Sequence, residues 1–143
     1  YQKQRIKVAK LHKKAAAQMK DFQNRLSKML VESQDIICIE DLKVKNMIKN
    51  HKLAKAIADA SWSQFINMLV YKSRIYGTTV VKVPPQNTTQ ACSTCGYVLT
   101  GDEKLTLEDR EWICPCCGTK HDRDHNSAIN VKIKGLELLF PAA

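Results

Sequence analysis

Residues 1–30 show the repeating pattern of apolar and polar positions that is typical of an α-helix. Their apolar residues recur in steps of four and three, and neither glycine nor proline interrupts the repeat. Such spacing brings apolar side chains onto one helix face, where they usually pack against other elements. We therefore predict one long helix over residues 1–30 with a packed stripe, which consists of Leu11, Ala15, Met19, Phe22, Leu26 and Met29.

Two shorter apolar stretches, with a helical pattern between them, predict buried β-strands. Residues 35–42 are apolar and β-branched between acids, and residues 78–83 are rich in valine and threonine before two prolines. Proline ends a strand because it has no N–H for the ladder. Between the strands, Ser61 is a candidate N-cap for a helix over residues 61–76 that ends before Gly77. One face of this helix has apolar residues at helical spacing, which predicts core packing rather than stacking on bases. The face consists of Trp62, Phe65, Ile66, Leu69 and Ser73.

Four of the six cysteines form two Cys-x-x-Cys pairs with eighteen residues between the pairs. This spacing predicts a zinc ribbon in which Cys92, Cys95, Cys114 and Cys117 place their sulfur atoms about 2.3 Å from one tetrahedral ion. Four thiolates leave no open position for a catalytic water, so we expect a structural zinc ion, with Cys116 outside its shell. An iron site of rubredoxin type uses the same ligands and stays open. Disulfides are disfavoured because nothing in the chain suggests export.

The zinc ribbon is predicted to occupy residues 87–120. Its acidic middle, from residue 101 to 111, is the expected exposed turn. Residues 111–113 are the expected strand that returns the chain to the second cysteine pair.

A final helix is predicted after the ribbon, beginning at Asp124 or Asn126 and running to about Leu138. Gly135 weakens its last turns. Asp122 and Asp124 both lie near its start, where a carboxylate can cap unpaired amides. The candidates for its buried face are Ala128, Val131, Ile133 and Leu136.

The chain is basic, with a net charge of +9, and nearly all of the excess lies at its amino end. Residues 1–28 carry nine lysines or arginines against one acid. A concentrated basic stripe favours a polyanionic partner, although a solvated helix face remains the alternative. The candidate nucleic-acid contacts lie on the long helix and in a second basic stretch over residues 43–55; they are Lys3, Lys7, Lys10, Lys14, Lys43, Lys45, Lys49 and Lys52.

The pattern also bears on the compartment in which the protein works. There is no run of eighteen apolar residues and no leader of the secretory type. We therefore expect a soluble protein in a reducing compartment, with no membrane partner.

Glu40 lies at the carboxyl end of the first predicted strand. In open α/β sheets functional groups gather beyond the carboxyl ends of the strands, so Glu40 or Asp41 is a candidate metal ligand. A solvated residue or a helix cap is the alternative for an acid at this place.

Three motifs together resemble the C-terminal part of the TnpB family, the transposon-encoded relatives of type V CRISPR effectors. Ile39–Leu42 resembles the second nuclease motif of that family, with Glu40 as its metal-binding glutamate. Thr89–Gly96 is similar to the family's entry into its zinc ribbon. The third motif, Asp-x-Asn-x-Ala, falls on residues 124–128, so Asp124 rather than Asp122 inherits the catalytic role.

The resemblance implies an α/β fold with a partial RNase H-like (RuvC) nuclease core. Residues 1–86 and 121–143 would belong to this core, and the ribbon would be inserted between them. The implied activity is RNA-guided cleavage of DNA in the cytoplasm, near the nucleoid of a prokaryote, with DNA and a guide RNA as partners. Magnesium or manganese would be held by Glu40, Asp124 and a further aspartate.

The family's first nuclease motif is a strand that carries an aspartate and precedes a long helix. No residue before Tyr1 supplies it, so we expect a fragment that is inactive alone. The alternatives are a non-catalytic zinc-ribbon module that binds nucleic acid, a nuclease-dead relative, or a ribbon that binds protein while the long helix oligomerises. The oligomeric state stays open.

Overall fold

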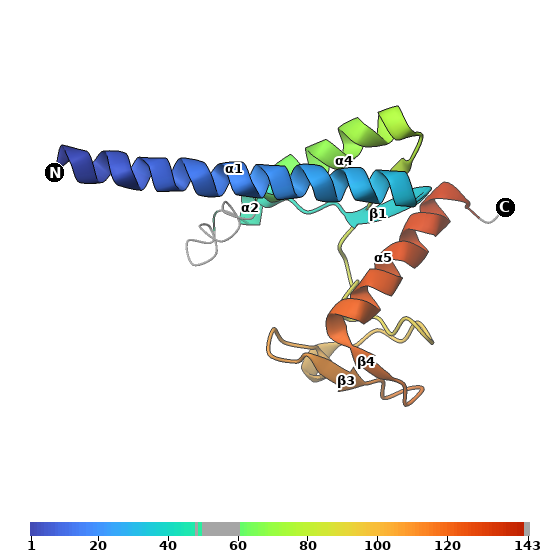
Figure 1. Cartoon of the computed structure of the whole chain (residues 1–143). Coiled ribbons are helices and arrows are strands. Elements are labelled where there is room, and N and C mark those ends of the chain that lie inside the picture. Colours follow the sequence, from blue (N-terminus) through green and yellow to red (C-terminus); the bar gives the residue numbers. More distant parts are fainter. Residues whose placement is uncertain (48, 50–60, 142–143) are drawn as a thin grey trace. The chain divides into compact units, whose positions relative to one another are not determined.

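The computed structural model describes residues 1–47, 49 and 61–141, and the chain divides into two compact units. The first unit comprises Tyr1–Ile37 with Lys43–Val80, and the second comprises Cys38–Leu42 with Val81–Ala143. Helices and strands alternate in an α/β arrangement (Figure 1). In chain order, the elements are α1 (Gln2–Ser33), β1 (Ile36–Glu40), α2 (Val44–Met47), α4 (Trp62–Tyr76), β2 (Thr79–Val83), η1 (Gly101–Glu103), β3 (Glu111–Ile113), β4 (Lys120–Asp122) and α5 (Arg123–Leu139).

The first unit is built on the packing of α4 against the C-terminal half of α1. The buried residues of α1 are Gln23, Ser27 and Val31, which follow one another at steps of four and so share one face. Hydrogen bonds add to this contact. Lys72 Nζ on α4 donates to Ser27 Oγ over 2.9 Å, and Thr78 Oγ1 donates to the Val31 carbonyl over 2.6 Å.

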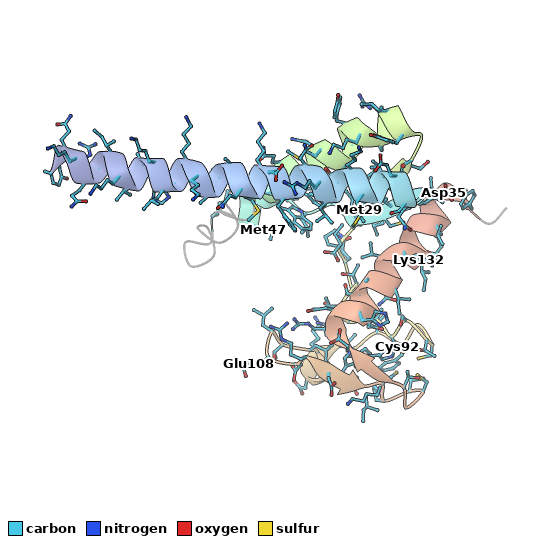
Figure 2. All side chains as sticks on the ribbon, in the orientation of Figure 1. Met29, Asp35, Met47, Cys92, Glu108 and Lys132 are labelled. Atoms are coloured by element: carbon cyan, nitrogen blue, oxygen red, sulfur yellow. The ribbon has the colours of Figure 1, made fainter. Side chains whose placement is uncertain are left out.

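The prediction of a packed apolar stripe on the long helix is wrong, although the helix itself is present. Leu11 is 67% exposed, Phe22 60% and Met29 55%. The helix buries the neighbouring face instead, because the small Ser27 side chain allows α4 to approach closely there. Figure 2 shows side chains standing out on all sides of the N-terminal half of α1, and residues 1–22 are all exposed.

Both ends of α4 lie where the sequence predicted them. Gly77 follows the helix in the left-handed conformation, with φ of 77°, as the C-cap prediction requires. Ser61 is the N-cap residue, as predicted, but its side chain makes no capping hydrogen bond. Its backbone is also left-handed, with φ of 48°, whereas a capping serine needs an extended backbone.

β1 and β2 form a two-stranded sheet. Thr79 N donates to the Asp35 carbonyl over 2.8 Å, and Asp41 N donates to the Val83 carbonyl over 2.8 Å. The two partners advance along the chain together, so the strands run parallel, with α4 in the connection between them. A parallel arrangement places the carboxyl ends of both strands at the same edge.

In the second unit, α5 lies against β1 at Gly135. A Cβ atom added to Gly135 would lie 2.3 Å from Cys38 Sγ and 2.9 Å from Cys38 Cβ. Glycine therefore permits the close approach of helix and strand here, in addition to lowering the helix propensity.

The buried face of α5 differs in part from the prediction. Val131 is buried and Leu136 is half-buried, as predicted. Ala128 and Ile133, however, are exposed, so their assignment to the core is wrong. The helix turns a more polar face inward, because its buried residues Asn126 and Asn130 bond to the backbone of the preceding segment.

Residues 87–120, which we call the four-cysteine ribbon, have a small core of their own. β3 pairs with β4 in antiparallel register, with Trp112 opposite His121. The buried residues of this cluster are Cys92, Leu99, Trp112 and Cys114, with Leu105 packed against them. In the described part of the chain, no helix is both long and apolar enough to cross a membrane.

Candidate metal centre and carboxylate site

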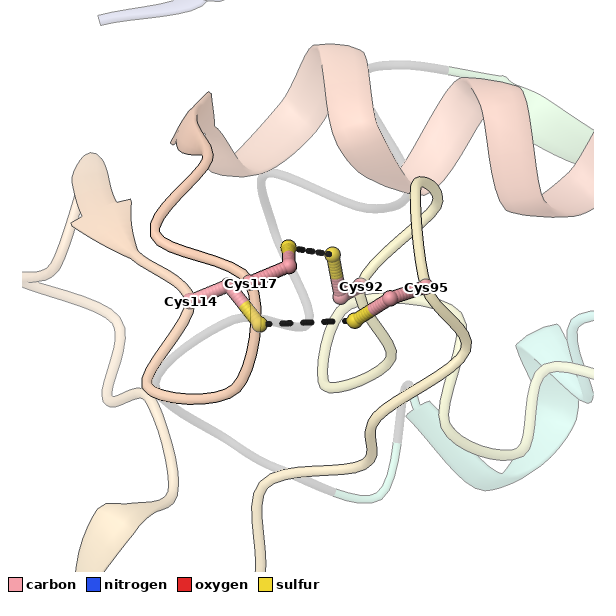
Figure 3. Close-up of side chains that lie close together, drawn as sticks. All are labelled: Cys92, Cys95, Cys114 and Cys117. Atoms are coloured by element: carbon pink, nitrogen blue, oxygen red, sulfur yellow. Dashed lines mark hydrogen bonds between the residues drawn. The ribbon is translucent and has the colours of Figure 1, made fainter.

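The four cysteines predicted as ligands converge on one point. Their sulfur atoms all lie within 4.8 Å of one another, and Cys92 to Cys117 and Cys95 to Cys114 span 3.7 and 3.6 Å (Figure 3). In a tetrahedron with metal–sulfur bonds of about 2.3 Å, neighbouring sulfur atoms lie about 3.8 Å apart. The four thiols could therefore hold one metal ion.

The two cysteine pairs sit on matching turns of the backbone. Gly96 N donates to the Cys92 carbonyl over 2.8 Å, and Gly118 N donates to the Cys114 carbonyl over 2.9 Å. Both glycines are left-handed, with φ of 77° and 73°. A side chain at either position would strain the turn, so glycine is what allows each pair to present two sulfur atoms to the same side.

The surroundings of the thiols differ from sulfur to sulfur. Hydrogen bonds from Thr119, whose hydroxyl lies 3.2 Å from the sulfur, lower the pKa of Cys117 to about 6. The Tyr97 backbone amide lowers the pKa of Cys95. Desolvation and hydrogen bonds with the other three thiols outweigh it and raise that pKa to about 12. Four close sulfur atoms cannot all ionise without a cation, and a divalent ion supplies the missing charge.

His121 belongs to this cluster, and the sequence analysis missed it. The side chain is buried, its Nε2 lies 3.1 Å from Cys92 Sγ, and its ring lies 4.8 Å from the Trp112 ring. An N–H···S bond from a neighbouring imidazole stabilises thiolate charge. The signal that could have found His121 is its position opposite Trp112 in the two strands of the ribbon. This position can be recognised only when the strand register is known.

The remaining cysteines lie outside the group. Cys116 is exposed beside the second pair, and Cys38 lies on β1. Burial raises the pKa of the Cys38 thiol, which favours its uncharged form.

Glu40 is the last residue of β1, and its carboxylate is held by one short hydrogen bond. Thr88 Oγ1 donates to Glu40 Oε1 over 2.6 Å. Asp41 follows the strand, and its backbone N–H bonds to the Val83 carbonyl. The glutamate therefore occupies the strand-end position that the sequence indicated.

The two aspartates at the start of α5 have different roles. Asp122 is the N-cap, and its Oδ1 accepts from His125 N over 2.8 Å. Asp124 makes no part of the cap. It is 67% exposed and meets Arg123 Nε at 3.2 Å and Arg110 at 3.4 Å. The capping alternative thus falls on Asp122, which leaves the carboxylate of Asp124 open to other partners.

A hollow lies beside Asp124. Its volume is about 330 Å³, and its lining includes Gln90, Thr106, Arg123 and Asp124. Arg123 donates to the Thr106 carbonyl over 2.9 Å, which fixes one wall of the hollow.

Within residues 1–47, 49 and 61–141, neither Glu40 nor Asp124 belongs to a group of three or more converging ligands. Among the described residues, the four cysteines are the group of three or more His, Cys, Asp or Glu side chains whose ligand atoms meet. The pairing of Glu40 with Asp124 at one metal site therefore stays a prediction.

The predicted nucleic-acid contacts are only partly described. Lys3, Lys7, Lys10 and Lys14 are exposed on α1, and Lys43 and Lys49 are exposed as well. The predictions for the Lys45 side chain and for Lys52 lie outside the residues that the structure describes.

Comparison with known proteins places the chain in a family. Residues 62–131 match the family described as "Cas12f1-like, TNB domain", and residues 1–51 match the one described as "Probable transposase". A Streptomyces pristinaespiralis protein named "Putative RNA-guided DNA endonuclease" is 43% identical over 94% of this chain. A TnpB-like protein of Acanthamoeba polyphaga mimivirus is 34% identical over 91% of it. The chain belongs to the TnpB-like family.

The chain spans 33% of the length of the Streptomyces relative and 25% of the viral one. Its fold is similar to a chain in the cryo-EM structure of a Cas12f1–sgRNA–target DNA complex. The TM-score is 0.69 at 21% identity, and the match covers 90% of this chain and 38% of that one.

Proposed function

We propose that this chain is the C-terminal part of an RNA-guided DNA endonuclease with a RuvC-like, metal-dependent site. The observation that carries the proposal is the placement of two acids in a member of this family. Glu40 ends a parallel strand, and Asp124 stands exposed at the start of a helix whose cap is supplied by Asp122. Such a protein would act on DNA in the cytoplasm of a prokaryote, near the nucleoid.

The four-cysteine ribbon has a structural role in this proposal. Four sulfur ligands on one ion leave no position for a reacting water. Zinc is the ion that we propose, because four thiolates suit its preference for tetrahedral coordination. Catalysis then depends on the carboxylates.

Glu40, Asp124 and a third carboxylate from another segment would hold magnesium or manganese. When bound, such ions activate water and stabilise the leaving oxygen during phosphodiester hydrolysis. Thr88 would orient Glu40, and the hollow beside Asp124 offers room for a substrate group. Arg110 and Arg123, which lie 3.4 and 3.2 Å from the Asp124 carboxylate, would compete with a metal ion for it.

DNA and guide RNA would bind in part through the exposed lysines of α1. Lys3, Lys7, Lys10 and Lys14 follow one another at steps of four and three, so they share a helix face. Contacts of this kind go to phosphates and carry little sequence preference, which base pairing with the guide would supply.

The test is cleavage of target DNA by the longer protein that this proposal implies, assembled with its guide RNA and magnesium. Glu40→Ala and Asp124→Ala should each abolish cleavage while zinc content stays at one ion per chain. Asp122→Ala is the matched control, since it removes a cap and no metal ligand, and it should retain most activity. Residues 1–143 alone should not cut DNA.

Continued cleavage by the Asp124→Ala protein would remove this residue from the site. A longer wild-type protein that binds guide and target with zinc in place, yet never cuts, would instead support the nuclease-dead alternative.

A further inference from the structure

We propose that Thr88 is a positioning residue for Glu40, and that Asn126 and Asn130 connect it to the metal-binding turn of the ribbon. The inference rests on the proposed function, since it assigns Glu40 to a catalytic metal. It adds a regulatory link: the folded ribbon would set the orientation of a nuclease carboxylate on another element.

Thr88 has one hydroxyl proton and two acceptors within reach. Its Oγ1 lies 2.6 Å from Glu40 Oε1 and 3.1 Å from the Pro85 carbonyl, and the residue is 3% exposed. The proton goes to the carboxylate, because that contact is shorter and a charged acceptor bonds more strongly. The Pro85 carbonyl offers a second place for the proton, so the buried hydroxyl keeps a partner if Glu40 shifts to a metal ion.

The two carboxylate oxygens of Glu40 also have different surroundings. Oε1 accepts the Thr88 hydroxyl, while Oε2 accepts no hydrogen bond from the part of the chain that the structure describes. A hydrogen bond to one oxygen fixes the rotation of the carboxylate and leaves the other free for a cation. This is the usual arrangement of a carboxylate ligand and its outer partner.

Two buried asparagines hold the segment that carries Thr88. Asn130 Nδ2 lies 2.9 Å from the Thr88 carbonyl and 2.7 Å from the Ala91 carbonyl. One turn earlier on α5, Asn126 Nδ2 donates to the same Ala91 carbonyl over 2.7 Å, and its Oδ1 accepts from Ser93 N over 2.9 Å. The two asparagines, which lie on one face of α5, therefore hold residues 88–93 by hydrogen bonds.

The backbone connects these hydrogen bonds to the proposed metal site. Cys92 lies between Ala91 and Ser93, the two residues that Asn126 holds. Peptide bonds and hydrogen bonds together thus connect Cys92, through Asn126 and Asn130 on α5, to Thr88 and Glu40. All of these residues belong to the second unit. Asn126 is 1% exposed and Asn130 7%, so their bonds are protected from water.

The experiment measures DNA cleavage as a function of magnesium concentration in the longer protein with its guide RNA. Thr88→Val removes the hydroxyl at nearly constant volume and should raise the half-maximal magnesium concentration about 10- to 100-fold, the usual cost of losing an outer partner. Saturating magnesium should restore part of the rate. Thr88→Ser should stay close to wild type, because it keeps the hydroxyl.

Thr100→Val is the matched control, since Thr100 is an exposed ribbon threonine whose side chain makes no capping bond. Zinc content and melting temperature are measured for each variant. Thr88→Ala replaces the valine variant if valine is not accommodated. A purely structural role would lower stability and leave the magnesium dependence unchanged.

The outcomes separate this inference from the proposed function. Cleavage by Thr88→Val with the wild-type magnesium dependence, while Glu40→Ala is inactive, overturns the positioning role and leaves the nuclease assignment standing. Cleavage that survives Glu40→Ala overturns both. A raised magnesium requirement in Thr88→Val, rescued in Thr88→Ser at unchanged zinc content, supports the inference.

Discussion

The four-cysteine ribbon and α1 keep their shapes by opposite means. The ribbon has short strands and a core of four buried residues, and its two turns are brought together at the sulfur atoms. α1 is a helix of 32 residues that buries three of them and carries surface pairs such as Arg25–Asp21. We expect the ribbon to depend on a central metal ion, whereas the helix depends on its own backbone and exposes most of its side chains.

The ribbon and α1 should therefore differ in how they respond to substitutions. A core as small as that of the ribbon is not expected to offset the entropy of its loops, so on our proposal metal binding supplies much of its stability. A long helix tolerates most single surface changes, because each contributes a few tenths of a kcal/mol. Changes at the ribbon should be large and cooperative, and changes on the outer face of α1 should alter binding rather than folding.

The largest effect is expected from removal of a metal ligand. Cys114→Ser should release the ion and unfold residues 87–120, since structural zinc contributes about 10–16 kcal/mol to small zinc domains. Helical circular dichroism from α1 should persist. Metal analysis and amide NMR spectra measure both effects. Cys116→Ser is the control and should keep the ion, because its exposed thiol lies outside the cluster; loss of metal in this variant would mean that the ligand set is different.

A second prediction concerns the contact between α5 and β1. Gly135→Ala puts a methyl group against Cys38, which should cost roughly 1–3 kcal/mol as overpacking. The gain in helix propensity returns about 1 kcal/mol of this. Urea unfolding measures the net loss. The same substitution in a Cys38→Ala background should cost less, and equal costs in both backgrounds would place the strain elsewhere.

A third prediction tests the two faces of α1 against each other. Val31→Ala should lower the free energy of unfolding by roughly 2 kcal/mol, because Val31 is 3% exposed. Leu11→Ala removes a larger side chain but should change it by less than about 0.5 kcal/mol, since Leu11 is 67% exposed. Thermal unfolding of both variants measures these two changes in stability. A larger loss for Leu11→Ala would restore the packed stripe that the apolar repeat predicted.

The smallest effect is expected for the basic face of α1. Replacing Lys3 and Lys7 by glutamine should weaken nucleic-acid binding a few-fold without altering the melting temperature. Each lost phosphate contact should reduce the slope of log affinity against log salt by about 0.7 to 0.9. Titration of a labelled strand at several salt concentrations measures the slope. An unchanged slope would mean that these lysines form a solvated face.

The convergence of the four cysteines could be predicted residue by residue because its signal is local. Two cysteine pairs and the glycines after them define the turns, whatever surrounds them. The helix at 61–76, the strand at 78–83 and the strand end at Glu40 were also readable, because their boundaries depend on nearby glycine, proline and acidic residues.

The rest required knowledge of tertiary partners. Helical period identified α1 but not its buried face, since Ser27 is buried only because α4 lies there. His121 and Asn126 are polar residues that periodicity assigns to solvent, yet both are buried by bonds to the ribbon. The sequence pattern of a single helix or strand does not predict such contacts with another element.

The bonds of Asn126 change what its motif can tell about a relative. Asp124 and Asn126 are two residues apart, but the asparagine is buried against the ribbon while the aspartate stands in solvent. We therefore expect folding to require the asparagine even in a relative that lacks the aspartate. If Asp124 is the catalytic acid that we propose, a sequence search that scores the motif as a whole would gather inactive relatives with active ones, and the acidic positions would have to be compared separately.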